Sequence, residues 1–181
     1  MRPKSVRITV LLVATLGVVG GVAIAAHDVQ DRSTLKVPNG GLAFSDFKGY
    51  ESWQDVAVSE TKTSVKAILA NDIMIQAYKD GVPGNGKPFP EGSKIVKIEW
   101  LKKVNTKSPY FVEVPDTLKS LSFIEKDSTR FPKTHGWAYA QWVNDPATQT
   151  LKASVSGPEC GYACHTAVAA QDYIFTLYPP R

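Results

Sequence analysis

The chain has 181 residues, of which 43% are hydrophobic and 21% are charged, and this size and composition suit one folded domain with a sizeable core. Its formal net charge is +4, but Arg2, Lys4 and Arg7 supply three positive charges before the first acidic residue, so residues 27–181 carry only +1. This near-neutral balance gives no electrostatic basis for binding nucleic acid or a membrane surface.

The N-terminus has the pattern of a secretory leader. Its positively charged start is followed by residues 8–26, an apolar stretch without charge, and Ala23-Ile24-Ala25 offers a small-residue cleavage site. We predict a signal peptide over residues 1–26. The alternative is an uncleaved anchor, because the stretch approaches the length that spans a bilayer. Both place the single folded domain, residues 27–181, outside the cytoplasm, and the expected location is the periplasm.

Helix-like and strand-like patterns follow one another along the rest of the chain. Residues 27–45 form a polar lead-in, and residues 47–58 have the apolar spacing of a short amphipathic helix. A second helix, capped by Asn71 or Asp72, is expected to end at Gly81, where a loop begins. β-strands are predicted at residues 63–70, 93–102, 109–114, 119–125 and 136–143. With one more helix expected near the C-terminus, the predicted fold is α+β with a predominantly antiparallel sheet and a few short helices.

Both cysteines of the chain lie in Cys160-Gly161-Tyr162-Ala163-Cys164-His165. A Cys pair followed at once by His is typical of a c-type haem attachment site, where each thiol adds to a haem vinyl group and the His binds the iron. We therefore predict one covalent haem c, held by Cys160 and Cys164, with His165 as the proximal iron ligand. Three residues separate the cysteines in place of the usual two, which leaves open whether both thioethers form. The alternative is a short-loop disulfide beside an unrelated His.

The ligand opposite His165 on the iron decides between electron transfer and small-molecule chemistry. After removal of the leader the candidates are Met74, His27 and His135. Met74 has the helical spacing of a core residue, His27 is close to the new terminus, and His135 is in a turn-like stretch. This shortage of ligands favours a five-coordinate iron with an open position, at which a small molecule binds or reacts.

Several segments of the chain form a characteristic series. In chain order they are Gly49-Tyr50-Glu51-Ser52-Trp53, Ala70-Asn71 before a helix, residues 89–97 (FPEGSKIVK), residues 126–131 (KDSTRF), residues 136–142 (GWAYAQW), Cys164-His165 and Asp172-Tyr173-Ile174-Phe175-Thr176. Together they resemble the cytochrome P460 family, which includes the beta-type cytochromes c′, and the similarity covers most of residues 48–178.

The resemblance implies a mostly antiparallel β-fold that forms a homodimer, with haem c near the C-terminal motif. In P460 proteins a lysine is also joined to the haem macrocycle, and the match through Phe89-Pro90-Glu91-Gly92 gives that position to Lys97. Lys94 and Lys87 are the nearby alternatives. By its own pattern Lys97 alternates with Val96 and Ile98 on a strand, which predicts a solvated outer face.

A further residue is implied near the open side of the iron, where the family often has an Arg. Lys66 falls close to that position. Lys differs from Arg in having a flexible side chain with a compact ammonium group instead of a planar, rigid guanidinium. The pattern alone predicts an exposed strand lysine. A carboxylate that accepts substrate protons must lie within hydrogen-bond reach of the iron site, and the sequence does not single one out.

The function that the resemblance implies is oxidation of hydroxylamine to nitrogen oxides at the haem, with electrons passing to a redox partner such as a small cytochrome c. One alternative is a nitric oxide binding protein without the cross-link, as in beta-type cytochromes c′. The other is a simple electron carrier, which needs Met74 or His135 as a strong sixth ligand.

Overall fold

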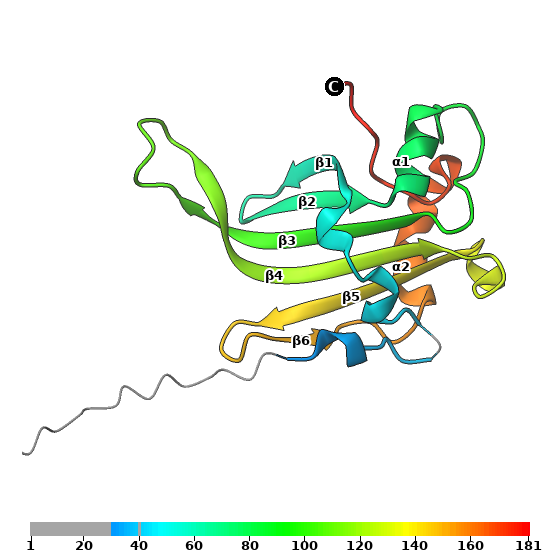
Figure 1. Cartoon of the computed structure of the whole chain (residues 1–181), viewed down its shortest axis with the longest axis horizontal. Coiled ribbons are helices and arrows are strands. Elements are labelled where there is room, and N and C mark those ends of the chain that lie inside the picture. The colour runs from blue at the N-terminus through cyan, green and yellow to red at the C-terminus, as the bar shows by residue number, and fades with distance from the viewer. Residues whose placement is uncertain (1–29, 40) are drawn as a thin grey trace, which may run out of the picture.

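The computed structural model describes residues 30–39 and 41–181; the predicted signal peptide and His27 lie outside these residues. A six-stranded antiparallel sheet dominates the described part, and each strand pairs with the next one in sequence (Figure 1). The strands are β1 (Gln54–Glu60), β2 (Ser64–Ala70), β3 (Lys94–Val104), β4 (Glu113–Lys126), β5 (Trp137–Asp145) and β6 (Thr150–Ala153). Two α-helices, α1 (Asp72–Lys79) and α2 (Glu159–His165), accompany five short 3-10 helices. The predicted α+β fold with an antiparallel sheet is confirmed.

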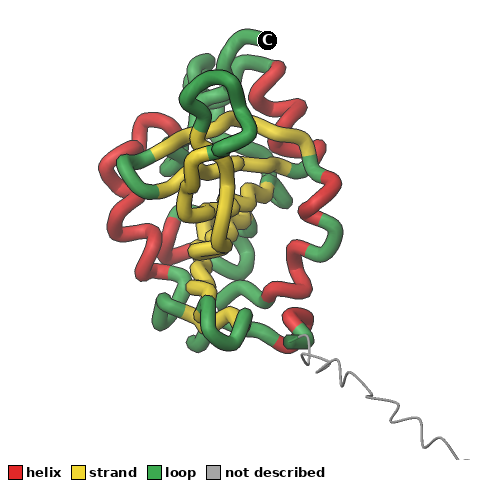
Figure 2. Tube along the Cα trace, turned by 90° about the vertical axis from the view of Figure 1, so that its left-hand side faces the viewer, coloured by secondary structure: helices red, strands yellow, loops and turns green. Residues whose placement is uncertain are grey.

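The sheet separates two hydrophobic cores, because alternate residues of each strand point to opposite faces. Val96 of β3 packs in one core, whereas its neighbour Ile95 packs in the other. Residues 35–53 cover what we call the N-terminal face of the sheet. Helix α1 and the C-terminal segment, together with α2, cover the opposite face, which we call the cavity face. Figure 2 shows the sheet between these two helical layers.

Aromatic rings fill the core on the N-terminal face. Phe123 of β4 is fully buried and stacks on Phe47 with 4.3 Å between ring centroids. Phe44 and Trp142 lie 4.9 and 5.1 Å from the same ring. Rings of this size bury much apolar area, so this packing fixes the N-terminal segment on the sheet and leaves the other face for the site.

Helix α1 forms where the sequence predicts it. The side chain of Asn71 accepts a hydrogen bond from the Met74 amide at 3.3 Å, as an N-cap does, and donates to the Gly92 carbonyl at 2.8 Å. Asp80 caps the other end, and Gly81 follows with φ of 89°, which favours glycine. The cap therefore fixes α1 both to its own first turn and to the loop that leads into β3.

Two local predictions are wrong, and one strand was missed. Residues 47–58 do not form one helix: two 3-10 turns, Phe44–Phe47 and Tyr50–Ser52, are followed by β1. Gly49 between these turns has φ of 84°, which interrupts helical backbone, and pairing with β2 then draws the rest of the segment into the sheet. The strand expected at residues 109–114 begins only at Glu113, and the short edge strand β6 was not predicted.

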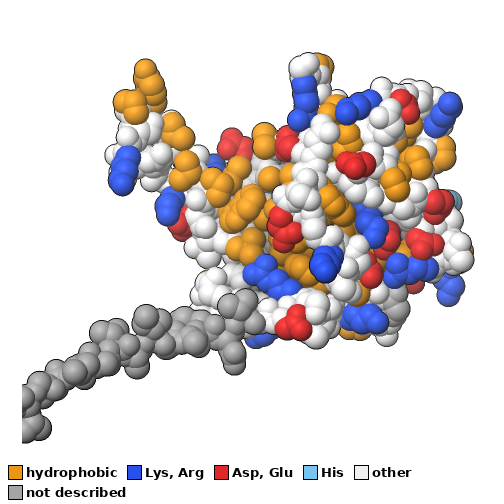
Figure 3. Space-filling view, in the orientation of Figure 1, with side chains coloured by type: hydrophobic (Ala, Val, Ile, Leu, Met, Phe, Trp, Pro, Cys, Tyr) orange, Lys and Arg blue, Asp and Glu red, His pale blue; other side chains and the backbone are white. Residues whose placement is uncertain are grey.

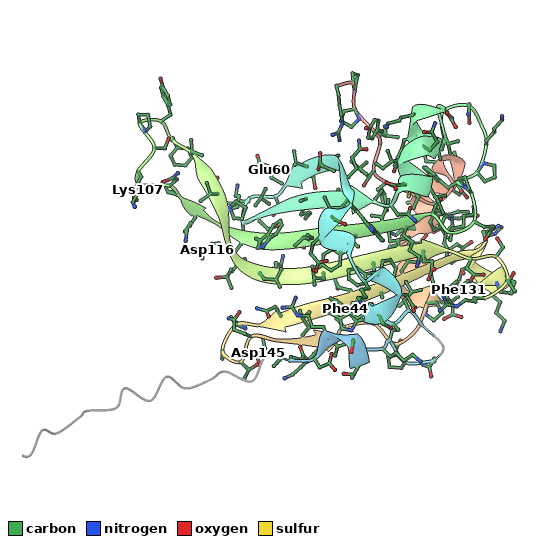
Figure 4. All side chains as sticks on the ribbon, viewed as in Figure 1. Phe44, Glu60, Lys107, Asp116, Phe131 and Asp145 are labelled. Atoms are coloured by element: carbon green, nitrogen blue, oxygen red, sulfur yellow. The ribbon has the colours of Figure 1, made fainter. Side chains whose placement is uncertain are left out.

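The hairpin of β3 and β4 extends beyond the rest of the sheet. Among the described residues, β2 pairs with β3 only as far as Leu101, and β5 pairs with β4 only from Ser120 onward. The remaining part of the hairpin, residues 102–118, is called the arm. Lys107 marks its tip and Asp116 lies near its base (Figure 4). None of the helices in residues 30–39 and 41–181 is long and apolar enough to cross a membrane.

Candidate haem site

A cavity of about 440 Å³ lies on the cavity face, between the sheet, α2 and the C-terminal segment. This volume is within the range of about 300–1,000 Å³ that cofactor and small-molecule sites occupy. Its walls come from β2 to β5, from the residues after β6 and from α2. The residues with reactive or polar side chains are Lys97, Ser122, Tyr139, Gln141, Ser154, Cys160, Cys164, His165 and Thr176.

Both cysteines line this cavity from α2, and they are not joined in a disulfide. In an α-helix, residues four apart lie one turn above each other on the same face. The three-residue spacing between Cys160 and Cys164 therefore directs both thiols toward one side of the helix. The extra residue is accommodated by regular helix geometry, and the alternative of a short-loop disulfide is not what the structure contains.

Gly161 allows α2 to approach the sheet closely. A methyl group at this position would overlap Cβ of Tyr139 on β5 and lie 2.7 Å from its Cγ, closer than real side chains approach. Only glycine lets the helix backbone pack directly on this ring. The contact therefore sets the depth of the thiols above the sheet, and a glycine between two cysteines was the sequence signal for it.

His165 at the end of α2 is held from several sides. Its Nδ1 lies 2.6 Å from the Tyr173 carbonyl, and its ring packs against Tyr139 and Phe175 at centroid distances of 4.3 and 4.9 Å. A carbonyl only accepts, so Nδ1 carries the proton and Nε2 keeps its lone pair. Within the described part of the chain, Nε2 has no hydrogen-bond partner. This is the arrangement that metal-binding histidines show.

Burial lowers the pKa of His165; the hydrogen bond to Tyr173 opposes this shift, and the nearby charge of Lys97 adds to it. The imidazole is therefore favoured in its neutral form, which is the form that binds metals.

Lys97 faces the cavity, so the solvated outer face predicted from its alternation with Val96 is wrong. It lies between Ile68 of β2 and Ser122 of β4 in the sheet. Burial lowers the pKa of its amine. The Glu99 carboxylate opposes this shift, whereas the positive charges of Lys66 and Lys119 add to it. The amine is thus more easily neutral, and nucleophilic, than a lysine in water.

The sequence model of the family described as cytochrome P460 matches residues 47–176, well over half of the chain. The chain belongs to the cytochrome P460 family. The match spans Lys97 together with the whole Cys and His segment. Membership identifies a haem c protein with an iron-binding role and points to an oxidoreductase. No curated protein matches the chain.

The residues of the cavity fit the haem of a P460 protein. Two free thiols on one helix face suit two vinyl groups, and a neutral imidazole with a free Nε2 suits one axial position of iron. Among the described residues, no group of three or more His, Cys, Asp and Glu side chains is placed to hold a metal ion. Iron held by a macrocycle needs only one such ligand, which His165 can provide.

The other lysines named from the sequence lie elsewhere: Lys94 and Lys87 as alternatives for the cross-link, and Lys66 as the residue implied near the open side of the iron. Lys94 is on the N-terminal face, where it donates to the Asp46 carbonyl at 2.7 Å and pairs with Glu125 at 3.1 Å. Lys87 is exposed in the loop before β3. Lys66 on β2 is paired with Glu99 on β3, two residue pairs along these strands from the pair of Ile68 and Lys97. Its side chain does not line the cavity. Of these four lysines, only Lys97 lines the cavity.

The candidate sixth ligands also lie outside the cavity. Met74 is fully buried in the core beneath α1, as its helical spacing predicts. His135 stacks on Tyr173 with 5.1 Å between ring centroids and does not line the cavity. Among the lining residues of the described chain, His165 is the only His and no Met is present. The geometry therefore does not favour a six-coordinate electron carrier.

Sequence analysis missed a row of polar side chains on the floor of the cavity. Gln141 donates to Ser122 Oγ at 3.3 Å, and Ser154 Oγ donates to Gln141 Oε1 at 2.8 Å. Ser122 on β4 and Gln141 on β5 occupy positions on the cavity face of the sheet, where apolar side chains are the rule, and Ser154 follows β6. The signal in the sequence was a polar residue among the apolar residues that point to the cavity face of a strand. It can be recognised only when the strand pairing shows which residues point to that face.

We predict that Gly161→Ala moves α2 away from β5 and lowers the yield of haem-loaded protein several-fold. Helix propensity alone would raise the free energy of unfolding by up to about 1 kcal/mol, because Ala favours helices more than Gly does. Overpacking against Tyr139 outweighs this with a loss of about 1–3 kcal/mol. Thermal unfolding and the ratio of haem to protein absorbance measure both effects.

Gly84→Ala is the matched control, because a methyl group there meets only the Gly81 carbonyl at 3.4 Å. If both variants keep the haem content and stability of the wild type, the close contact between α2 and β5 does not set the site.

Proposed function

We propose that this P460 protein oxidises hydroxylamine, with haem c joined to Cys160 and Cys164, His165 on the iron and Lys97 bonded to the macrocycle. One observation carries the proposal: a single cavity is lined by both thiols, by the imidazole and by the half-buried Lys97. These groups come from α2 and β3, which are far apart in the chain and are separated by three strands.

The haem, when bound, supplies the redox chemistry: the nitrogen of hydroxylamine is oxidised to nitrous oxide or nitrite, electrons leave to an acceptor such as a small cytochrome c, and protons leave to solvent. The residues of the chain hold and tune this group. Tyr173 keeps the proton of His165 on Nδ1, so that the lone pair of Nε2 would be free to bind the iron. Ser122, Gln141 and Ser154 offer donors and acceptors that can orient a small polar substrate or water in the cavity.

The proposed bond between Lys97 and the macrocycle requires a neutral amine. The burial that lowers the pKa of Lys97 makes this form more accessible. Joining Nζ to a ring carbon removes one hydrogen from each, together with two electrons, so a peroxide or a similar oxidant is needed. A bond to Lys97 would distort the macrocycle and shift its electronics, which is one of the recognised ways in which a protein tunes haem reactivity.

Covalent attachment is tested by extracting protein that was expressed with its leader and a haem-maturation system. We expect the colour to stay with the protein in acidified organic solvent, because thioethers survive this treatment. Cys160→Ala and Cys164→Ala each leave one possible thioether and are expected to lower haem content several-fold. Extractable haem in the wild type, or a disulfide between the two Cys, would contradict the proposal.

The role of Lys97 is tested by Lys97→Ala, with Lys66→Ala, two residue pairs along the strands, as the matched control. We expect the shifted, broad absorption of a cross-linked haem to become that of a simple five-coordinate haem c, while covalent attachment survives. Hydroxylamine-dependent reduction of an acceptor should fall at least about tenfold, equivalent to about 1.4 kcal/mol of activation free energy. Lys66→Ala should retain the wild-type spectrum.

The result also separates the competing functions. Identical spectra of the wild type and Lys97→Ala would exclude the cross-link and favour nitric oxide binding at an unmodified haem. Different spectra without hydroxylamine-dependent reduction in the wild type would keep the cross-link and refute the substrate.

We also propose that the protein is a homodimer whose subunits meet through the arm. Tyr110 and Phe111 at its tip are 80% and 78% exposed, and Figure 3 shows hydrophobic side chains gathered there. Within the described chain, the outer edges of residues 103–104 and 113–117 pair with no further strand, whereas Lys102 and Leu118 at the base are hydrogen-bonded to Thr63 and Asn144. Unpaired strand edges can form hydrogen bonds with another strand, and exposed aromatic rings can pack against other rings. The arm of a second copy, related by a two-fold axis, offers both of these features.

Light scattering at micromolar concentration tests this dimer. We expect a dimeric mass for the wild type and a monomeric mass for a variant that combines Tyr110→Ser and Phe111→Ser. Ile73→Ser, which changes an exposed apolar residue on α1, should remain dimeric. A monomeric wild type, or a dimer unaffected by the double change, would refute the arrangement.

A further inference from the structure

We propose that Asp172 is a positioning residue that holds the Tyr173 carbonyl on Nδ1 of His165 and thereby sets the strength of the bond between this imidazole and the haem iron. The inference rests on the proposed role of His165 as iron ligand. Asp172 lies outside the cavity wall, so it would act through its neighbour.

The carboxylate of Asp172 is bound from three separate parts of the chain. Lys126 Nζ at the end of β4 lies 2.6 Å from Oδ2, and the Phe89 amide donates to the same oxygen at 2.7 Å. Trp137 Nε1 at the start of β5 donates to Oδ1 at 3.2 Å. The side chains of Lys126 and Asp172 are only 7% and 12% exposed, so this ion pair is largely shielded from water. Three donors on different elements fix the carboxylate more firmly than one local bond could.

The bonds to the Asp172 carboxylate hold an unusual backbone turn at Asp172 and Tyr173. Asp172 and Tyr173 have φ of 48° and 63°, two consecutive left-handed residues without a glycine. Asp adopts this conformation fairly readily, whereas a bulky residue such as Tyr does so rarely. The turn reverses the chain after the last 3-10 helix, Thr166–Gln171, and directs the Tyr173 carbonyl back to His165. A conformation of this kind persists where the surroundings hold it in place.

The hydrogen bond to this carbonyl has an electronic consequence. A carbonyl that accepts from Nδ1–H makes the imidazole a more basic ligand, which strengthens its bond to iron and stabilises the ferric state. If the carboxylate is lost, the turn relaxes and the Nδ1 hydrogen bond lengthens. The iron–histidine stretching frequency should then fall and the reduction potential should rise.

Asp172→Asn tests the inference in the holoprotein. In Asn, an NH₂ group replaces one carboxylate oxygen. Both oxygens of Asp172 accept hydrogen bonds, so this NH₂ group faces a donor in either orientation, and the neutral side chain forms no ion pair with Lys126. Resonance Raman spectra of the ferrous protein give the iron–histidine stretch, and a redox titration gives the potential. We expect a lower stretching frequency and a higher potential than in the wild type.

Glu125→Gln is the matched control for general damage to the fold. Glu125 is also a buried carboxylate, paired with Lys94 and Arg130 at 3.1 Å each, but it lies on the N-terminal face. We expect this variant to lose stability while it keeps the wild-type stretching frequency. Trp137→Phe removes one donor to Asp172 without changing any charge, and its stretching frequency should fall in the same direction. This second variant also serves if Asp172→Asn yields no folded holoprotein.

An unchanged stretching frequency in Asp172→Asn, or in Trp137→Phe where the first variant does not fold, would overturn the positioning role. An equal shift in Glu125→Gln would overturn it too, because the effect would then follow stability alone. Failure of the proposed function looks different: if His165 is not the iron ligand, the iron–histidine stretch is absent from the wild type or persists in His165→Ala.

Discussion

The close packing of α2 on β5 is the contact on which the site depends. Gly161 lies against the ring of Tyr139, and no side chain larger than hydrogen fits between them. Because the cysteines are one helical turn apart, the depth of this contact places both thiols, and the His165 that follows them, above the same part of the sheet. A helix held further out would leave the lysine of β3 and the imidazole of α2 on opposite sides of a wider opening.

The sheet provides the second half of the site through its strict alternation. Each residue of β3 points away from its neighbours, so Val96 packs among aromatic rings while Lys97 faces the cavity. The aromatic core on the N-terminal face fixes the register in which this happens, because a slip by one residue would put Lys97 among those rings. The cost of burying a charge there is the reason that the register is well defined.

On each face of the sheet, a largely buried carboxylate is paired with basic and hydrogen-bonding groups. Glu125 and Asp172 each have a lysine partner and further donors, and both lie at the end of the sheet where β3 begins. Buried charges are retained where paired partners satisfy them, and removal of one partner is far more costly than the pair is stabilising. The same end of the sheet therefore carries both the ion pairs that fix loops and the turn that reaches His165.

The sequence by itself determined the elements whose signals are local. The cap at Asn71, the strands at residues 63–70 and 93–102, and the helix that bears Cys160, Cys164 and His165 all follow from short patterns, and so does the similarity to the cytochrome P460 family. The helix expected at residues 47–58 failed, because pairing with β2 overrides the apolar spacing of an edge segment. Only the tertiary structure decided which face Lys97 occupies, that Gly161 is a packing position, and that distant donors hold Asp172 beside the carbonyl that meets His165. These depend on register and on contacts between residues far apart in the chain, which no local pattern encodes.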